Sequence, residues 1–124
     1  MEQSRELREY AGSCHCGAVK FSLRSAAIDR GMRCTCSICR RKGALMSAEA
    51  YPASELQIQA TPDSLSTYTF GSGKAKHQFC KHCGIYTFHE TFRFPGHYRV
   101  NLGCIDEVDI LNLDVELFDG KSLL

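Results

Sequence analysis

The sequence lacks any long hydrophobic run. Its first ten residues, MEQSRELREY, are mostly charged and polar, so they do not have the pattern of a signal peptide. No segment approaches the roughly 20 apolar residues that a membrane-spanning helix requires. These absences argue against a secreted or membrane protein, and we expect a cytoplasmic protein with no membrane partner.

The sequence also lacks a strong charge of either sign. Its 15 basic and 14 acidic residues give a net charge of +1, so overall charge provides no reason to expect a nucleic-acid partner. Internal repeats, low-complexity segments and Pro/Gly/Ser-rich linkers are absent as well. Because 124 residues are enough to bury a core, we expect one domain spanning residues 1–124.

Alternation of apolar and polar residues is the main pattern that the chain does contain. A period of two is typical of strands with one buried face. Helical periodicity is weak, apart from one turn after Cys39 and a short stretch at 106–111. The alternating segments are 19–23, 56–60, 98–104 and 111–117, and shorter extended candidates are 65–70 and 85–94. We therefore predict a mostly β single domain with many short strands.

Cysteine, in contrast, is abundant, with eight in 124 residues. A secreted protein would pair them as disulfides, whereas in a reducing compartment such a count indicates metal binding or catalysis. Since no signal peptide is recognised, metal is favoured, and the spacing of the cysteines provides a stronger test.

Two cysteine pairs come just before predicted strands. Cys80 and Cys83 in FCKHCG have the C-x-x-C spacing and a following glycine, which permits the turn that brings two thiolates to one ion. Redox dithiols share this spacing but precede a helix, whereas IYTF looks extended. Cys14 and Cys16 in SCHCG are too close in sequence for an unstrained disulfide. Together the pairs supply four sulfurs, which predicts a closed, structural zinc site.

The remaining cluster, CTCSIC, holds Cys34, Cys36 and Cys39. Three protein ligands leave the fourth zinc position for water or substrate, as in a catalytic site, and a sulfur-rich shell suits a substrate thiolate. The alternative is that one of these thiols is buried and another pair completes a structural site. We expect two zinc ions per chain, the second bound less tightly and partly absent after isolation.

Cys104 continues the apolar side of the predicted strand 98–104. We expect it to be a small buried residue, and the alternative is that it is the fourth ligand of the second zinc. His15 and His82 lie inside the predicted metal turns, where the cysteines already meet the ligand count. One of the isolated histidines could move a proton near the open zinc, but the sequence does not select which. These histidines are His77, His89 and His97.

A basic run, Arg40, Arg41 and Lys42, directly follows the third thiol of CTCSIC. Such a run is ordinarily a solvated surface, but here it could offset the charge of a zinc ion bound by three thiolates. Arg40 and Arg41 could also attract the carboxylate of a substrate. Three lysines near the other cysteines could add to this field: Lys74, Lys76 and Lys81.

The segments SCHCGAVKF, RCTCSICRRKG, FCKHCGIYTF and VNLGCID, in this order, resemble the glutathione-dependent formaldehyde-activating family, to which the domain of centromere protein V is also similar. The resemblance implies short antiparallel sheets around a zinc site, with a core at about 12–118. It implies a structural zinc on the four thiols of SCHC and CKHC and a catalytic zinc on the three thiols of CTCSIC, in agreement with the ligand count. Thr35 stands where many members carry histidine.

The resemblance further implies carbon–sulfur lyase chemistry, in which formaldehyde is joined to glutathione to give S-hydroxymethylglutathione. Our leading hypothesis is therefore a zinc-dependent protein that acts on an adduct of an aldehyde with glutathione or another small thiol. A second hypothesis is a non-catalytic, zinc-stabilised interaction module, and a third is a protein that uses its thiols directly for redox chemistry. The sequence leaves the oligomeric state open.

Overall fold

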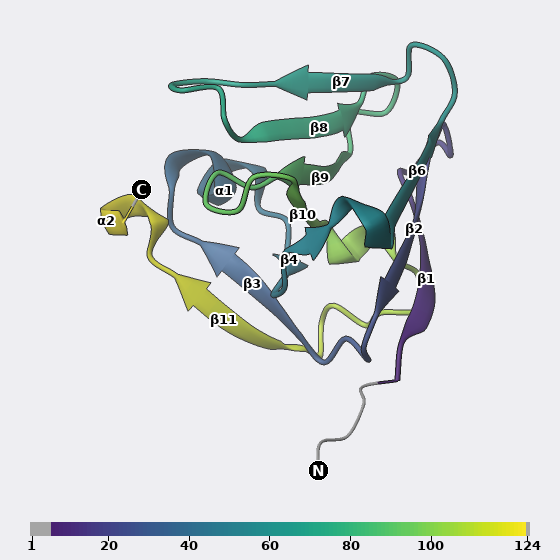
Figure 1. Ribbon diagram of the computed structural model, residues 1–124, viewed down its shortest axis with the longest axis horizontal. Coiled ribbons are helices and arrows are strands. Elements are labelled where there is room, and N and C mark those ends of the chain that lie inside the picture. Colours follow the sequence, from purple (N-terminus) through teal and green to yellow (C-terminus); the bar gives the residue numbers. More distant parts are fainter. Residues whose placement is uncertain (1–5, 124) are drawn as a thin grey trace.

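Three small β-sheets form the framework of the fold (Figure 1). The computed structural model describes residues 6–123. The first sheet has the order β1 (Arg8–Ser13), β2 (Val19–Ser25), β6 (Leu56–Ala60). The second has the order β5 (Tyr51–Pro52), β10 (His97–Val100), β9 (Tyr86–Glu90), β8 (Lys76–Cys80), β7 (Leu65–Tyr68). The third has the order β11 (Asp114–Phe118), β3 (Arg30–Cys34), β4 (Met46–Ser47).

Helices are few and short. They comprise α1 (Ser37–Lys42), α2 (Gly120–Leu123) and the 3₁₀ turns η1 (Ala53–Glu55) and η2 (Leu102–Cys104). The strand pairs are antiparallel except for β3 with β11, which run parallel. In the part of the chain that the structure describes, no helix is long and apolar enough to cross a membrane. The predicted mostly β single domain of small antiparallel sheets is thus confirmed.

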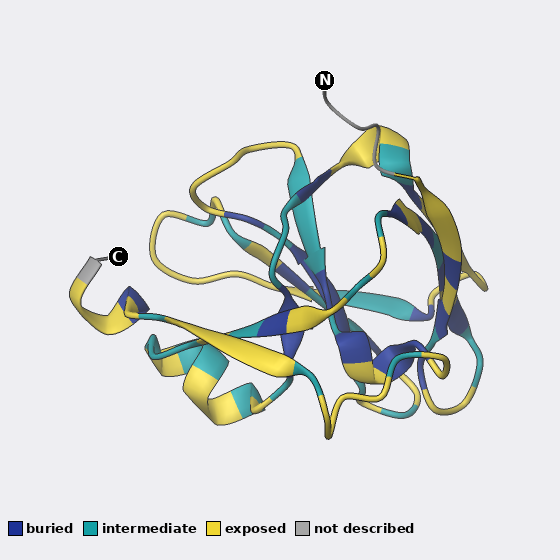
Figure 2. Cartoon of the chain, turned by 90° about the horizontal axis from the view of Figure 1, so that it is seen from below, coloured by how far each residue is buried: buried dark blue, intermediate teal, exposed yellow. Residues whose placement is uncertain are grey.

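The alternation in β2 builds the contact between the first two sheets. In this strand Val19, Phe21 and Leu23 are buried, while Lys20 and Arg24 face solvent. Figure 2 colours the chain by this difference in burial. The Phe21 ring meets Phe88 of β9 edge to face, with ring centres 6.0 Å apart. Gly12 of β1 lies against the same ring, and a Cβ atom at this position would overlap it. Glycine at position 12 therefore leaves room for the Phe21 ring, through which the first sheet contacts the second.

The predicted strand 98–104 is correct only in its first half. β10 ends at Val100, and Leu102–Cys104 forms the 3₁₀ turn η2 instead. The Asn101 side chain accepts a hydrogen bond of 2.9 Å from the Gly103 N–H, which favours this turn over a continued strand. Leu102 and Cys104 nevertheless remain buried. The alternation therefore correctly predicts which side chains are buried, but it does not predict the backbone conformation.

The C-terminal alternation, 111–117, is also only partly a strand. Residues 109–112 form a turn, held in part by a 3.1 Å hydrogen bond from the Asn112 N–H to the Asp109 carbonyl, and β11 begins at Asp114. Leu117 is 73 % exposed and Val115 51 % exposed, so the alternation here does not mark a buried face. β11 lies at the edge of its sheet, beside β3 only.

Both predicted helical segments differ from the structure. The turn expected after Cys39 is α1, which begins at Ser37 and contains that cysteine, and the stretch 106–111 is not helical. Five strands were not predicted: β1, β3, β4, β5 and β8. In β1 and β3 an inward-facing position is a glycine, which gives no apolar signal. These are Gly12 and Gly31, and both are buried.

Candidate metal centres and the adjoining cavity

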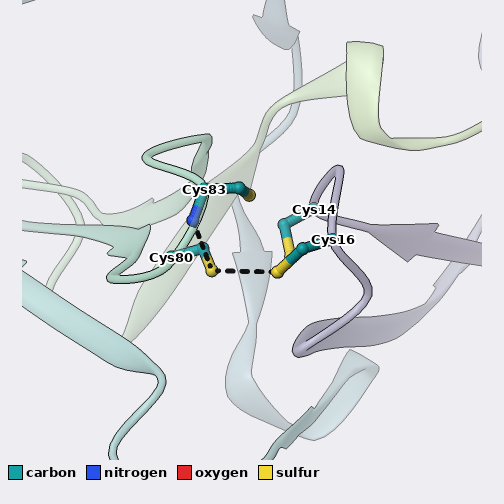
Figure 3. A group of neighbouring side chains, drawn as sticks. All are labelled: Cys14, Cys16, Cys80 and Cys83. Carbon is teal, nitrogen blue, oxygen red and sulfur yellow. Dashed lines mark hydrogen bonds between the residues drawn. The ribbon is translucent and has the colours of Figure 1, made fainter.

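Cys14, Cys16, Cys80 and Cys83 come together from two turns at strand ends (Figure 3). The first pair follows β1, and the turn closes with a 2.9 Å hydrogen bond from the Cys14 N–H to the Val19 carbonyl. The second pair begins at Cys80, the last residue of β8, and its turn requires the positive φ of 78° at Gly84. Local turn chemistry thus brings each pair together, and sheet packing brings the pairs to each other.

The four sulfur atoms have the geometry of a tetrahedral thiolate site. All lie within 4.8 Å of one another, and the Cys14–Cys16 and Cys16–Cys80 sulfur distances are both 3.7 Å. A zinc–sulfur bond of about 2.3 Å gives a tetrahedral edge of about 3.8 Å. A disulfide would need about 2.05 Å, and all eight cysteines are free thiols. The donor set therefore fits a four-coordinate zinc ion.

Backbone N–H groups surround these sulfurs. The Val19 N–H donates to Cys14 Sγ at 3.3 Å, and the His82 N–H donates to Cys80 Sγ at 3.3 Å. The Ile85 N–H is the main reason that the pKa of the Cys83 thiol falls to about 6. These donors favour thiolates over thiols, and metal binding requires thiolates.

The second group is made of Cys34, Cys36 and Cys39, whose sulfurs also lie within 4.8 Å of one another. Cys34 is the last residue of β3, Cys36 is the N-cap of α1, and Cys39 lies within that helix. In the described part of the chain no further cysteine, histidine or carboxylate atom joins this group at that distance. The three thiols predicted from spacing are thus assembled by one strand end and one helical turn.

The C-terminal segment holds the loop between the first two of these thiols. Thr35 donates its N–H to the Phe118 carbonyl at 3.0 Å and its hydroxyl to Asp119 at 2.8 Å. The Lys121 N–H in turn donates to the Thr35 hydroxyl at 3.0 Å. The C-terminal segment therefore holds the three-thiol loop through both the backbone and the side chain of Thr35.

The basic residues of α1 differ in where they lie. Arg40 and Arg41 are exposed, and Arg41 donates to the Ser37 carbonyl at 3.1 Å. Lys42, in contrast, has a buried ammonium with no hydrogen-bond partner among the described residues, placed 4.0 Å from the centre of the Tyr86 ring. Burial lowers the pKa of Lys42, while Cys39 acts in the opposite direction. Lys42 is thus the basic residue of α1 whose charge reaches the thiols.

A cavity of about 460 Å³ adjoins the three-thiol group. Cys34, Cys36 and Cys39 all contribute to its wall. The cavity has an aromatic border of Phe70, Phe92, Phe94 and Phe118, and its cationic side chains are Arg93, Arg99 and Lys121. Arg40 and Arg41 do not line it, and their predicted attraction for a carboxylate stays a prediction. The size and mainly apolar lining are typical of a small-molecule site.

Two of the three isolated histidines, His77 and His89, lie in the wall of this cavity. Both are buried, and the Tyr86 hydroxyl lies between them, 2.6 Å from His77 Nδ1 and 2.8 Å from His89 Nδ1. His97 lies instead beside the Pro95 carbonyl, outside the cavity lining. The sequence did not distinguish these histidines, because their selection depends on strand register.

Cys104 lies apart from the three-thiol group. It is 6 % exposed, and its thiol is 3.8 Å from the Tyr86 carbonyl oxygen. Burial raises the pKa of this thiol to about 12, with the Cys14 and Cys83 thiols acting in the same direction. The prediction of a small buried residue is therefore confirmed. His15 and His82 are exposed, as are Lys74, Lys76 and Lys81.

Comparisons with known proteins agree with these observations. The family model "glutathione-dependent formaldehyde-activating enzyme" matches residues 9–121. A crystal structure of a Rhodobacter sphaeroides protein is similar to the chain at 37 % sequence identity and a TM-score of 0.74. The match covers 85 % of the present chain and 97 % of that protein.

Proposed function

We propose that this chain, which belongs to the glutathione-dependent formaldehyde-activating family, is a zinc-dependent carbon–sulfur lyase. Its substrate would be the adduct of an aldehyde with a small thiol such as glutathione. The observation that carries the proposal is the opening of the three-thiol group into a cavity of about 460 Å³. The four-thiol group, by comparison, has the ligand number of a closed structural site.

Cys34, Cys36 and Cys39 would hold the second zinc ion. Bound there, zinc supplies Lewis-acid chemistry that lowers the pKa of a coordinated thiol. Soft thiolate ligands favour a soft fourth partner, and the sulfur of the substrate provides one. Lys42, enclosed beside Cys39, would offset part of the negative charge that three thiolates bring.

The rest of the cavity would orient the substrate. Arg99 is fixed by two hydrogen bonds, from Nη1 to the carbonyl oxygens of Ser47 at 3.0 Å and Ala48 at 2.6 Å. Such a fixed cation, together with Arg93 and Lys121 in the same wall, suits the carboxylates of glutathione. The phenylalanine border limits the access of water to the reacting carbon, which favours adduct formation over hydration of the aldehyde.

The non-catalytic interaction module receives less support. It needs a fourth protein ligand at the second zinc, and Cys104, the candidate for that role, does not join the three-thiol group. Direct redox use of the thiols is not favoured either, since the shortest sulfur distances suit metal coordination better than a disulfide.

Metal analysis and thiol binding test the proposed function together. We expect two zinc ions per purified chain, glutathione binding by calorimetry, and formation of S-hydroxymethylglutathione by exchange NMR when formaldehyde is added. Cys36→Ser should retain one zinc ion and lose both binding and turnover. Cys104→Ala is the matched control and should keep two zinc ions. A wild-type protein with two zinc ions that neither binds thiols nor turns over would contradict the proposal.

A further inference from the structure

Two histidines in the wall of the cavity are hydrogen-bonded to one tyrosine, Tyr86, which does not itself line the cavity. His77 of β8 and His89 of β9 are direct cross-strand partners, with ring centres 5.3 Å apart. The Tyr86 hydroxyl contacts Nδ1 of both rings, at 2.6 Å and 2.8 Å. The hydroxyl is therefore hydrogen-bonded to Nδ1 of each imidazole, and neither Nε2 atom takes part in these bonds.

A β-bulge brings Tyr86 to the histidines. The register passes from Gln78↔Phe88 to Phe79↔Tyr86, so Thr87 is an extra residue in β9. In a regular strand Tyr86 and His89 would lie on opposite faces, since side chains alternate. The extra residue places both on the same face, and bulges of this kind redirect side chains next to functional sites.

The Tyr86 hydroxyl couples the tautomers of the two histidines. A hydroxyl has one proton, so it donates to one Nδ1 atom and accepts an N–H from the other. Burial lowers the pKa of His77 to about 4 and that of His89 well below its ordinary value, so both rings are neutral. A neutral imidazole carries one proton. One Nε2 atom is therefore an N–H donor, and the other is a bare acceptor.

One of these nitrogens already lacks a partner. His77 Nε2 is buried and has no hydrogen bond to any described residue, although its ring lines the cavity. Leaving a buried polar atom unsatisfied destabilises the fold, and a native structure that retains one calls for an explanation. A bound substrate with a polar group at this position would satisfy the nitrogen.

We propose that His77, Tyr86 and His89 form a proton-transfer unit that moves the thiol proton of the substrate to the aldehyde oxygen. This inference rests on the proposed function, and it assigns His77 and His89 as catalytic residues and Tyr86 as the positioning residue that couples them. A donor and an acceptor on adjacent rings match the addition reaction, which removes a proton from sulfur and adds one to oxygen.

The proton transfers balance without any charged intermediate on the protein. As the carbon–sulfur bond forms and the C=O double bond becomes a single bond, the S–H proton passes to the bare Nε2 atom. The Nδ1 proton of that ring passes to the Tyr86 oxygen, and the Tyr86 proton passes to Nδ1 of the other ring. The Nε2 proton of this second ring then passes to the oxygen of the aldehyde. The two rings have exchanged tautomers, and breakdown of the adduct or proton exchange with cavity water restores them.

Nitrogen-15 NMR of the zinc-loaded protein tests the pairing without any substrate. We expect one of the two rings to carry its proton on Nδ1 and the other on Nε2, with signals assigned by His77→Gln and His89→Gln. In Tyr86→Phe, which keeps the ring beneath Lys42, the complementary pattern should disappear. Identical tautomers at both positions in the wild-type protein would overturn the inference.

Kinetics test the transfer itself. Tyr86→Phe should lower kcat for adduct formation by roughly 100-fold or more, leave glutathione affinity unchanged and reduce the solvent isotope effect. Tyr68→Phe is the matched control and should keep wild-type kcat. The Tyr68 ring also lies near the His77 ring, with ring centres 6.5 Å apart, but it makes no hydrogen bond to that ring.

Wild-type kcat in Tyr86→Phe would overturn the inference while leaving the proposed function intact. Absence of turnover in the wild-type protein itself would overturn both, and the tautomer pattern would then reflect a structural role only.

Discussion

The two thiol groups have the same chemistry but different positions in the chain and in the fold. The four-thiol group joins cysteines 64 positions apart, between two turns that belong to different sheets. The three-thiol group comes from one strand end and the helix beside it, and it opens into the cavity. A metal ion bound by a long-range group of this kind would cross-link the fold, whereas one bound by a local group would contribute little to folding and would be accessible from the cavity.

The largest effect that should separate the two groups is on folding. Cys80→Ser removes a ligand from the four-thiol group, and we expect an unfolded chain by circular dichroism. A structural zinc ion contributes roughly 10–16 kcal/mol in small zinc domains, which exceeds or matches the total stability of about 5–15 kcal/mol of a typical domain. Cys36→Ser removes a ligand from the three-thiol group and should leave a folded protein with a cooperative thermal transition.

Titration with a chelator tests the same difference between the two thiol groups. Titration of the wild-type protein should remove the first zinc ion with no loss of secondary structure, and removal of the second should coincide with unfolding. If the first ion removed unfolds the chain, or if Cys80→Ser folds normally, the assignment of a structural and an accessible site is wrong.

An intermediate effect is expected from the charge beneath the three-thiol group. Lys42→Met removes the enclosed ammonium beside Cys39, and we expect the affinity of the second site for zinc to fall about tenfold. The physical reason is that three thiolates on a divalent ion leave a net negative charge that Lys42 offsets at close range. Competition with a chromophoric chelator measures this affinity, and the four-thiol site provides an internal reference.

Arg41→Met is the matched control for this charge. It removes a cation from the same helix, but one that is exposed and screened by solvent. We expect less than a twofold change in the affinity of the second site. Equal effects of the two substitutions would mean that the general field of the basic run matters and that the enclosed position of Lys42 does not.

The smallest effect is expected from the link between the three-thiol loop and the C-terminal segment. Thr35→Val keeps the shape of the side chain but removes the hydroxyl that bonds Asp119 and the Lys121 N–H. Losing such exposed hydrogen bonds costs about 1 kcal/mol, so we expect a roughly fivefold weaker second zinc site and no change at the four-thiol site. Thr67→Val in β7, which removes an exposed hydrogen bond to Gln78 of β8, should change neither site.

The part of the site that the sequence predicts best is the division of the cysteines into a group of four and a group of three. Each cysteine pair or triplet is local, so its spacing alone limits which sulfurs can share an ion. The strands with regular alternation, such as β2, were also predictable, because their inward positions carry large apolar side chains. β1 and β3 were missed where Gly12 and Gly31 take those positions, since close approach to Phe21 or Leu45 leaves no room for a side chain.

The cavity and its histidines could not be predicted from the sequence. The pairing of His77 with His89 depends on the register of β8 and β9, and the approach of Tyr86 depends on a bulge at Thr87. Neither the register nor the bulge produces a local pattern in the amino-acid sequence. The same is true of Lys42, which is adjacent in sequence to Arg41 but differs from it because the helix directs only one of the two toward Tyr86.

The parallel pairing of β3 with β11 has a consequence for the order in which the protein matures. During synthesis, both halves of the four-thiol group are available once residue 83 has emerged, long before Phe118 and Asp119, which hold Thr35. The four thiols can therefore come together while the C-terminal segment is still missing. The loop that carries the three thiols is held only after β11 has paired with β3. A metal ion bound by the three thiols would thus be the later of the two to be fixed in place.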